Sequence, residues 1–393
     1  MNKVMVMGLA FAAVAFTPAD ARALPAWARK YNMNCSGCHA PAVPRLNAKG
    51  FAFKWAGYRM PEEIGENQEV KQVSDFLAAR AAFQYLFAKT ETQPADAQGF
   101  VLDNATLFAA GSLGKNYGAM LEFSHNASGV DLTANMVGVW GKESEYIGVR
   151  GGEMHWLLEG SVAGFDRTTG INFPTPVGGP TTSANPFQFD SHALGVEAFY
   201  VKGKNRLSFE VLNSVSASGQ MTGPNAPTTK DFVAIDQFIY DNRGSGFTAA
   251  GYYGSIDGLD TTVAIMTSHF TRLAFTANKI FQHAELLGGY VYSKDSDLPI
   301  SRTFTRAEMT GSGYWVYGGY TFPSALTVFS RYEFVNPNTD ATKAGSTRFA
   351  FGGVLPANLP EYVRMAAEYT LDMPKAIGGL KRHGLTLELM FNF

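Results

Sequence analysis

Apolar and polar residues alternate along most of the chain after residue 75. The pattern is clearest at the C-terminal end, where every second residue is apolar. These apolar positions are Leu385, Leu387, Leu389, Phe391 and Phe393. Successive side chains of a strand point to opposite faces, so this alternation predicts strands with one apolar and one polar face. The same alternation recurs at residues 117–124, 207–212 and 363–371.

Two architectures use such strands: a soluble β protein whose apolar faces form a core, and a membrane barrel whose apolar face meets lipid. The amphipathic segments are about ten residues long, which suits a tilted strand that crosses a bilayer. Many of them end in Tyr, Phe or Trp, as the interface girdles of barrels do. The terminal strand ending at Phe393 resembles the assembly signal of bacterial outer-membrane barrels. We therefore predict that residues 73–393 form a mainly β, porin-like, antiparallel outer-membrane barrel of about 16 strands.

This prediction places one face of each strand in the lumen. The carboxylates expected there are Glu122, Glu210, Glu333, Glu368 and Glu388. They would keep the lumen wet or attract a hard cation, and a change at Glu388 is expected to cost little stability. Tight turns are expected at residues 202–205 and 241–246. Extracellular loops or plain spacers are expected at about 168–185 and 219–229, which are rich in Gly, Pro, Thr and Ser.

The first residues have the pattern of a secretory signal peptide. Lys3 provides a positive start, Val4–Phe16 is apolar, and two A-x-A cleavage sites precede Leu24. The apolar run is too short for a membrane helix, which needs about 20 residues. We therefore predict a signal peptide at residues 1–23.

The composition excludes some classes of partner. The formal net charge is −2, so the chain offers no basic field for nucleic acid. Charged residues make up 17%, below the roughly 25% that is usual for soluble domains. Aromatic residues reach 13% and glycine counts 41. These values suit a sheet-rich protein with an apolar exterior and with outer-membrane lipid as a partner.

The only two cysteines stand in the pattern C-x-x-C-H, formed by Cys35, Cys38 and His39. This is the attachment pattern of a c-type haem, in which two thiols bind the porphyrin and the histidine ligates the iron. A redox dithiol or half of a zinc site are the alternatives. A structural zinc site needs four N or S ligands, and no second C-x-x-C exists. We therefore predict one covalent haem c, with His39 as the proximal iron ligand.

The sixth ligand is less clear from the sequence. Met or His is expected opposite the proximal histidine. Met60 lies far enough beyond His39 for the chain to wrap over the other haem face, whereas Met33 is too close to Cys35 in sequence to reach round. His125 or His155 could serve if the haem docks inside the barrel. Met60 is our expected sixth ligand.

The residues on either side of the motif are distinctive. They are Ala23-Leu24-Pro25-Ala26-Trp27-Ala28-Arg29-Lys30-Tyr31-Asn32-Met33-Asn34 before it, and Pro44-Arg45-Leu46-Asn47-Ala48-Lys49-Gly50-Phe51 and Lys54-Trp55-Ala56-Gly57-Tyr58 after it. Over about residues 23–61 the chain resembles the fused monohaem cytochrome–porins of iron-oxidising bacteria and related cytochrome–barrel proteins. That family has a Leu-Pro-x-aromatic-Ala-Arg lead before C-x-x-C-H, and Pro-x-Leu and Gly-Tyr after it.

The resemblance has departures. The iron-oxidising proteins usually have Gln-Thr-Gly where this chain has Lys30-Tyr31-Asn32, and Leu-Thr-Pro-Phe-Gly-Arg where it has Leu46-Asn47-Ala48-Lys49-Gly50-Phe51. The resemblance therefore supports the predicted architecture more strongly than it supports iron as the substrate. It implies a small helical monohaem cytochrome c domain, which we place at residues 24–72. A unit this small needs a metal, a disulfide or a partner to fold, and covalent haem would supply much of the core.

The combination suggests electron transfer across the outer membrane of a Gram-negative bacterium. The haem would lie at the periplasmic side or in the lumen, take electrons from an extracellular donor and pass them to a periplasmic cytochrome. The resemblance implies Fe(II) as that donor, and the activity would then be that of an Fe(II):cytochrome oxidoreductase. One alternative is a solute porin with a structural or gating haem plug. Another is a small haem enzyme, which would need an open sixth position on the iron.

Overall fold

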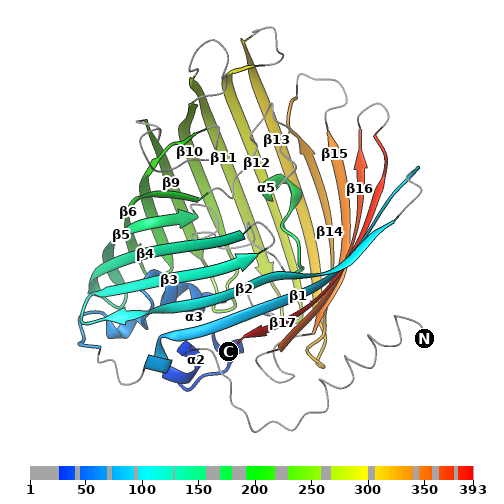
Figure 1. Ribbon diagram of the computed structural model, residues 1–393. Coiled ribbons are helices and arrows are strands. Elements are labelled where there is room, and N and C mark those ends of the chain that lie inside the picture. The colour runs from blue at the N-terminus through cyan, green and yellow to red at the C-terminus, as the bar shows by residue number, and fades with distance from the viewer. Residues whose placement is uncertain are drawn as a thin grey trace.

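The computed structural model describes residues 26–39, 45–68, 73–92, 96–126, 129–155, 169–178, 192–216, 229–257, 267–299, 306–339, 345–355, 363–375 and 379–392 (Figure 1). The predicted signal peptide lies outside these residues. Short helices come first, and a closed sheet of long strands follows. None of the described helices has the length and apolar character of a membrane span. The predicted division of the chain between residues 72 and 73 stays a prediction.

The helical elements before the sheet are all short. They are α2 (Ala26–Lys30), η1 (Cys35–Gly37), α3 (Ala48–Trp55), η2 (Pro61–Glu63) and η3 (Val73–Asp75). Helix α3 begins at Asn47, whose side-chain oxygen accepts a hydrogen bond from the backbone N–H of Gly50 at 3.0 Å. This bond satisfies one of the N–H groups that a helix start leaves without an intrahelical partner. Helices this short depend on packing for their stability.

Seventeen strands form one sheet. They are β1 (Leu77–Thr90), β2 (Ala97–Leu113), β3 (Tyr117–Asn126), β4 (Gly129–Lys142), β5 (Glu145–His155), β6 (His192–Lys202), β7 (Asn205–Asn213), β8 (Val215–Ser216), β9 (Lys230–Ile239), β10 (Gly246–Asp257), β11 (Thr267–Ile280), β12 (Ala284–Pro299), β13 (Arg306–Thr321), β14 (Thr327–Asn336), β15 (Ser346–Leu355), β16 (Val363–Pro374) and β17 (Arg382–Asn392). Strand β8 has two residues and pairs in parallel with β10. The other sixteen pair antiparallel in chain order, and β1 pairs with β17. The predicted antiparallel barrel of about 16 strands is therefore confirmed.

Short turns join the strands at one rim of the barrel. The hairpin at Lys202–Asn205 and the turn between β9 and β10 belong to this rim, which confirms both predicted turns. Gly203 has a φ of 60°, a left-handed conformation that glycine adopts without steric cost. The start of β1 and the end of β17 lie at the same rim (Figure 1). We call it the short-turn rim.

The alternation of the sequence corresponds to the two faces of the wall. On β7, Leu207 and Phe209 are more than half exposed, whereas Ser208 and Glu210 are buried. The interface between lipid and protein in such barrels is an apolar outer band. The exterior here has that character, because exposed Leu, Val, Phe and Tyr side chains occur on strands all around the sheet. The predicted assignment of apolar residues to the outer face is confirmed.

The expectation for Glu388 was wrong. Its side chain is fully buried on the inner face of β17, where it pairs with Arg364 and accepts a hydrogen bond from Gln84 Nε2 at 3.1 Å. Removal of one partner from a buried ion pair leaves an uncompensated charge, which costs about 3–5 kcal/mol. Alternation shows which face a carboxylate occupies, and it does not show that an arginine of the next strand depends on it.

We expect Leu387→Arg to destabilise the barrel by about 2–4 kcal/mol, because an arginine at the middle of the lipid-facing surface loses its hydration. Leu387 alternates with buried Glu388 on β17 and is partly exposed. Urea titration of the protein refolded in phospholipid bilayers would measure the change. Leu387→Val is the matched control and should have little effect. Equal unfolding midpoints for the two variants would contradict the assignment of this face to lipid.

Residues 169–178 lie inside the barrel. Helix α5 (Thr175–Gly178) contacts β12, β13 and β14 (Figure 1). Glu368 accepts hydrogen bonds from the backbone N–H groups of Ile171 and Asn172, and Arg364 donates to the carbonyls of Thr169 and Gly170 at 3.0 Å. In the chain these residues stand between β5 and β6, whose facing ends lie at the rim opposite the short-turn rim, so the loop is where it was predicted. The sequence did not show that residues 169–178 fold into the lumen. Residues 219–228 of the other predicted loop lie outside the described residues.

Candidate functional site

The C-x-x-C-H segment forms a single tight turn. The backbone N–H groups of Cys38 and His39 both donate to the carbonyl oxygen of Cys35, at 3.1 and 2.9 Å. Helix α3 packs directly against this turn, because the N–H of Asn47 donates to the Cys38 carbonyl at 2.9 Å. A Cβ at Gly50 would lie 2.4 Å from the same carbonyl oxygen, so only glycine permits this approach. The turn and α3 therefore form one unit.

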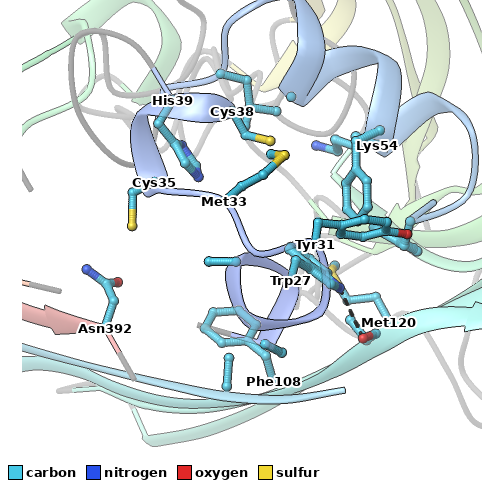
Figure 2. Close-up of a pocket in the computed structure, with 18 of the residues that line it drawn as sticks. Trp27, Tyr31, Met33, Cys35, Cys38, His39, Lys54, Phe108, Met120 and Asn392 are labelled. Carbon is cyan, nitrogen blue, oxygen red and sulfur yellow. Dashed lines mark hydrogen bonds between the residues drawn. The ribbon is translucent and has the colours of Figure 1, made fainter. Parts of the chain in front are cut away.

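A cavity of about 350 Å³ opens beside this turn (Figure 2). The N-terminal segment contributes Trp27, Met33, Cys35, Cys38, His39 and Met60 to its lining. The barrel wall contributes Ala79, Phe108, Ala110 and Met120. All four site residues predicted from the sequence thus meet at one cavity, which is lined mainly by apolar side chains. Figure 2 shows Met33 at the cavity near Cys38. The expectation that Met33 cannot reach round to the other haem face stays a prediction.

His39 has a defined tautomer in this arrangement. Its Nδ1 lies 3.0 Å from the carbonyl oxygen of Arg45. A carbonyl only accepts hydrogen bonds, so Nδ1 carries the proton. In the neutral form of the ring the lone pair is then on Nε2, which is a form that ligates metals. A β-bridge between His39 and Leu46 holds the two backbones together.

Met60 is held by a hydrogen-bonded bracket. Its backbone N–H donates to Glu63 Oε2 at 2.9 Å, and the Tyr31 hydroxyl donates to the same oxygen at 2.7 Å. Burial and this hydrogen bond raise the pKa of the Tyr31 phenol, so the phenol stays protonated and remains a donor. Met60 is only 6% exposed. Tyr31 and Glu63 therefore fix the backbone that carries the predicted sixth ligand.

Cys38 is half-buried at the cavity. Burial raises the pKa of its thiol, and the nearby Lys49 ammonium opposes that effect. A structural zinc site needs four N or S ligands. The described residues contain no group of three or more His, Cys, Asp or Glu side chains that could hold a metal ion.

The N-terminal segment is hydrogen-bonded to the short-turn rim. Arg59 is fully buried and donates to the backbone carbonyls of Gly114, Lys115 and Tyr117. Trp27 Nε1 donates to the Ala110 carbonyl at 3.2 Å. Burial lowers the pKa of the Arg59 guanidinium, but arginine stays charged at any physiological pH. We call residues 26–39 and 45–68 the plug, because they close part of the lumen at this rim.

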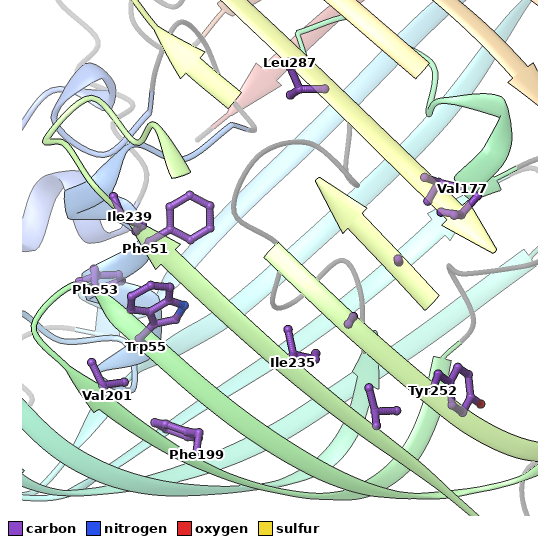
Figure 3. Packing of buried hydrophobic residues seen from close by; sticks show 14 of the residues in the cluster. Phe51, Phe53, Trp55, Val177, Phe199, Val201, Ile235, Ile239, Tyr252 and Leu287 are labelled. Carbon is purple, nitrogen blue, oxygen red and sulfur yellow. The ribbon is translucent and has the colours of Figure 1, made fainter. Parts of the chain in front are cut away.

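The plug shares an apolar core with the inner wall (Figure 3). Phe51 and Trp55 of the plug belong to one buried cluster with Val201, Phe199 and Ile239 of β6 and β9. The alternation predicted a mostly polar inner face, and this part of the wall departs from it. The physical reason is that the plug covers these positions and removes them from water. Their apolar character matches the apolar side chains of the plug that pack against them.

Elsewhere on its inner face the wall is charged, and the charges are paired with one another. Arg331 contacts Glu333 and Glu368, and Arg206 contacts Glu197. All of these side chains are buried. Four of the five predicted inner carboxylates are buried, and Glu122 lies 3.6 Å from Arg80. The expectation of lumen carboxylates is confirmed, and four of the five lie within ion-pair distance of an arginine.

The histidines proposed as alternative ligands do not gain support. His125 is exposed and stands on the outward-facing side of β3, in alternation with Glu122 and Ser124. The His155 side chain lies outside the described part of the chain. Sequence reasoning did not identify Arg45, Arg59 or Glu63 as parts of the site. Their positions beside the motif in the sequence were a weak signal, because charged residues in so short a segment would otherwise face water.

No family model and no curated protein matches this chain. Solved structures do match it. The anion-selective porin from Comamonas acidovorans is 12% identical, with a TM-score of 0.58 over 81% of this chain and 98% of that one. The channel DcaP of Acinetobacter baumannii gives 10% and 0.56 over 81% and 96%. Pseudomonas putida OprB gives 8% and 0.59 over 81% and 94%. The chain therefore has the fold of outer-membrane porins.

Proposed function

We propose that this protein is an outer-membrane cytochrome–porin. One covalent c-type haem would occupy the cavity beside the plug turn and carry single electrons from an extracellular donor to a periplasmic cytochrome. The observation that carries this proposal is the convergence of Cys35, Cys38, His39 and Met60 on one apolar cavity. A surface turn with the same motif and no cavity would offer no place for a porphyrin.

The residues fit the group. The two thiols would hold the porphyrin by thioether bonds, and His39 Nε2 would ligate the iron. Met60, or Met33 beside it, would offer a thioether sulfur from the cavity wall. When bound, the haem would supply a one-electron redox couple. The apolar lining from Trp27 and Phe108 would keep water away from it, which together with the axial ligands sets the reduction potential.

The position of the cavity suits electron transfer at the periplasmic side. The plug lies at the rim where the barrel strands begin and end, which is the side of short turns in outer-membrane barrels and is periplasmic. A soluble cytochrome could approach there. The barrel provides a route through the membrane whose backbone groups are all paired within the wall. Fe(II) enters the proposal through the resemblance of the motif region, and we assign no lumen carboxylate to it.

We expect Fe(II) to reduce the haem of the purified holoprotein. Stopped-flow mixing under anaerobic conditions would follow the haem absorption bands. Met60→Ala should leave the haem attached and shift its potential, because axial ligation sets that potential. The matched control is Met120→Ala, at a barrel methionine that also lines the cavity. An unchanged ferric spectrum after minutes in millimolar Fe(II) would exclude iron as the donor, and an inert Met60→Ala would direct attention to Met33.

A solute porin with the plug as a gate is the second candidate. The comparisons favour it more directly than they favour electron transfer, because two of the matched proteins are a porin and a channel by name. The charged side chains on the inner face of the wall are consistent with the passage of polar solutes. The two functions differ in what the plug does: it either carries electrons in place or moves to admit solute. The third candidate, a small haem enzyme, would be indicated by a five-coordinate iron spectrum.

A further inference from the structure

A carboxylate of the barrel wall forms an ion pair with the plug close to the C-x-x-C-H turn. Glu285 of β12 pairs with Arg45: the guanidinium Nη1 donates to Oε2, and Nη2 contacts Oε1. Both residues are buried, at 7% and 9% exposure. A bidentate pair of this kind fixes orientation as well as distance. The two residues stand 240 positions apart, so the pair joins the plug to a strand that is remote in sequence.

The wall holds Glu285 firmly. Asn278 of the neighbouring strand β11 donates from Nδ2 to Glu285 Oε1 at 3.0 Å. The Asn278 side-chain oxygen accepts in turn from the backbone N–H of Gly246 at 2.8 Å. The carboxylate is therefore tied to two further strands of the barrel, which makes it a rigid anchor for Arg45.

The backbone carbonyl of the same Arg45 accepts a hydrogen bond from His39. The Arg45 carbonyl lies 3.0 Å from His39 Nδ1, and it directly precedes Leu46, which forms the β-bridge to His39. A hydrogen bond from Nδ1–H to such an acceptor fixes the ring of a metal-ligating histidine and raises its basicity. The guanidinium end of Arg45 is bound to the wall, and its carbonyl end is bound to the imidazole.

We propose that Glu285 is a positioning residue for the haem ligand His39, acting through Arg45. This inference rests on the proposed haem site. It makes the haem potential depend on how the plug is seated in the barrel: a seated plug holds the Arg45 carbonyl against Nδ1 and keeps the imidazole a strong donor. When the anchor is lost, the carbonyl moves, the ring becomes a weaker donor, and the ferrous state gains relative to the ferric state.

Glu285→Gln should raise the reduction potential of the holoprotein, measured by anaerobic redox titration of the haem bands. Mutation of a residue that hydrogen-bonds a metal-ligating histidine typically changes metal affinity or activity by about 10–100-fold. We therefore expect a change of about tenfold in the equilibrium between ferric and ferrous haem, which is about 59 mV for one electron. The matched control is Glu388→Gln, which removes another buried barrel carboxylate from its pair with Arg364 of the neighbouring strand. It should lower barrel stability and leave the potential unchanged.

Two double variants separate positioning from simple loss of charge. The neutral pair Arg45→Met with Glu285→Leu keeps the net charge but removes the anchor, so the potential should still rise. The reversed pair Arg45→Glu with Glu285→Arg restores an ion pair and should bring the potential back to within about threefold of the wild-type equilibrium. A neutral pair with the wild-type potential would overturn the inference. Wild-type protein without covalent haem would instead overturn the proposed function, which a mass spectrum of the same sample decides.

Discussion

Replacement of both Cys35 and Cys38 by serine is expected to abolish covalent haem attachment and to leave the barrel folded. The thioether bonds need both sulfur atoms, and serine keeps the size and the turn of the segment. Denaturation followed by acid–acetone extraction should release any remaining haem from the variant and none from the wild type. Mass spectrometry of the mature chain should show one haem in the wild type only. Haem that survives extraction in the double variant would contradict the attachment site.

His39→Ala separates attachment from ligation. Both thiols remain, so haem should stay bound to the chain, but the iron should lose its proximal ligand, and both its absorption spectrum and its rate of reduction by Fe(II) should change. His125→Ala is the matched control, because His125 is exposed on β3, on the side that faces away from the lumen. It should behave as the wild type. A His39→Ala protein that is reduced at the wild-type rate would show that another residue ligates the iron.

The barrel could be predicted because the pattern within each strand is enough to assign its two faces. Alternation of apolar and polar residues indicates which side chains face lipid, and Leu207 and Phe209 occupy the outer face as this alternation predicts. Strand number followed from segment length and the preference for even barrels. Residues 169–178 could not be placed this way, since their Gly and Pro content is equally typical of a surface loop. Their place in the lumen depends on Glu368 and Arg364, which are remote in sequence.

The candidate site divides in the same manner. Cys35, Cys38 and His39 form a contiguous motif, so sequence alone located them. Met60 was an expectation from chain length, and its presence at the cavity supports that expectation without testing ligation. The role of Glu285 could not be predicted, because its contact with Arg45 joins residues that are 240 positions apart in the sequence. A charged residue at an inward position of an alternating strand was the available signal, and it applies equally to Glu388.

Gly118→Val is expected to unseat the plug and open the lumen. Gly118 faces inward on β3, and a Cβ there would lie 2.1 Å from the carbonyl oxygen and 2.9 Å from the carbonyl carbon of Gly57. Both contacts are with backbone, so no side-chain rotation relieves them. Overpacking of this kind costs about 1–3 kcal/mol or more, and it acts next to Arg59, whose hydrogen bonds to the rim need the same close approach.

Conductance in planar bilayers would measure the result. A 16-stranded barrel without a plug leaves an aqueous channel, so Gly118→Val should conduct ions well above the wild type while it retains covalent haem. Gly99→Val is the matched control, because a Cβ at Gly99 on β2 meets nothing within 4 Å. Its conductance should equal that of the wild type. A wild-type protein that already conducts as freely as Gly118→Val would favour the solute-porin alternative, since the plug would then offer no barrier. A closed wild type and an open variant would show that the plug seals the lumen where the haem is proposed to work.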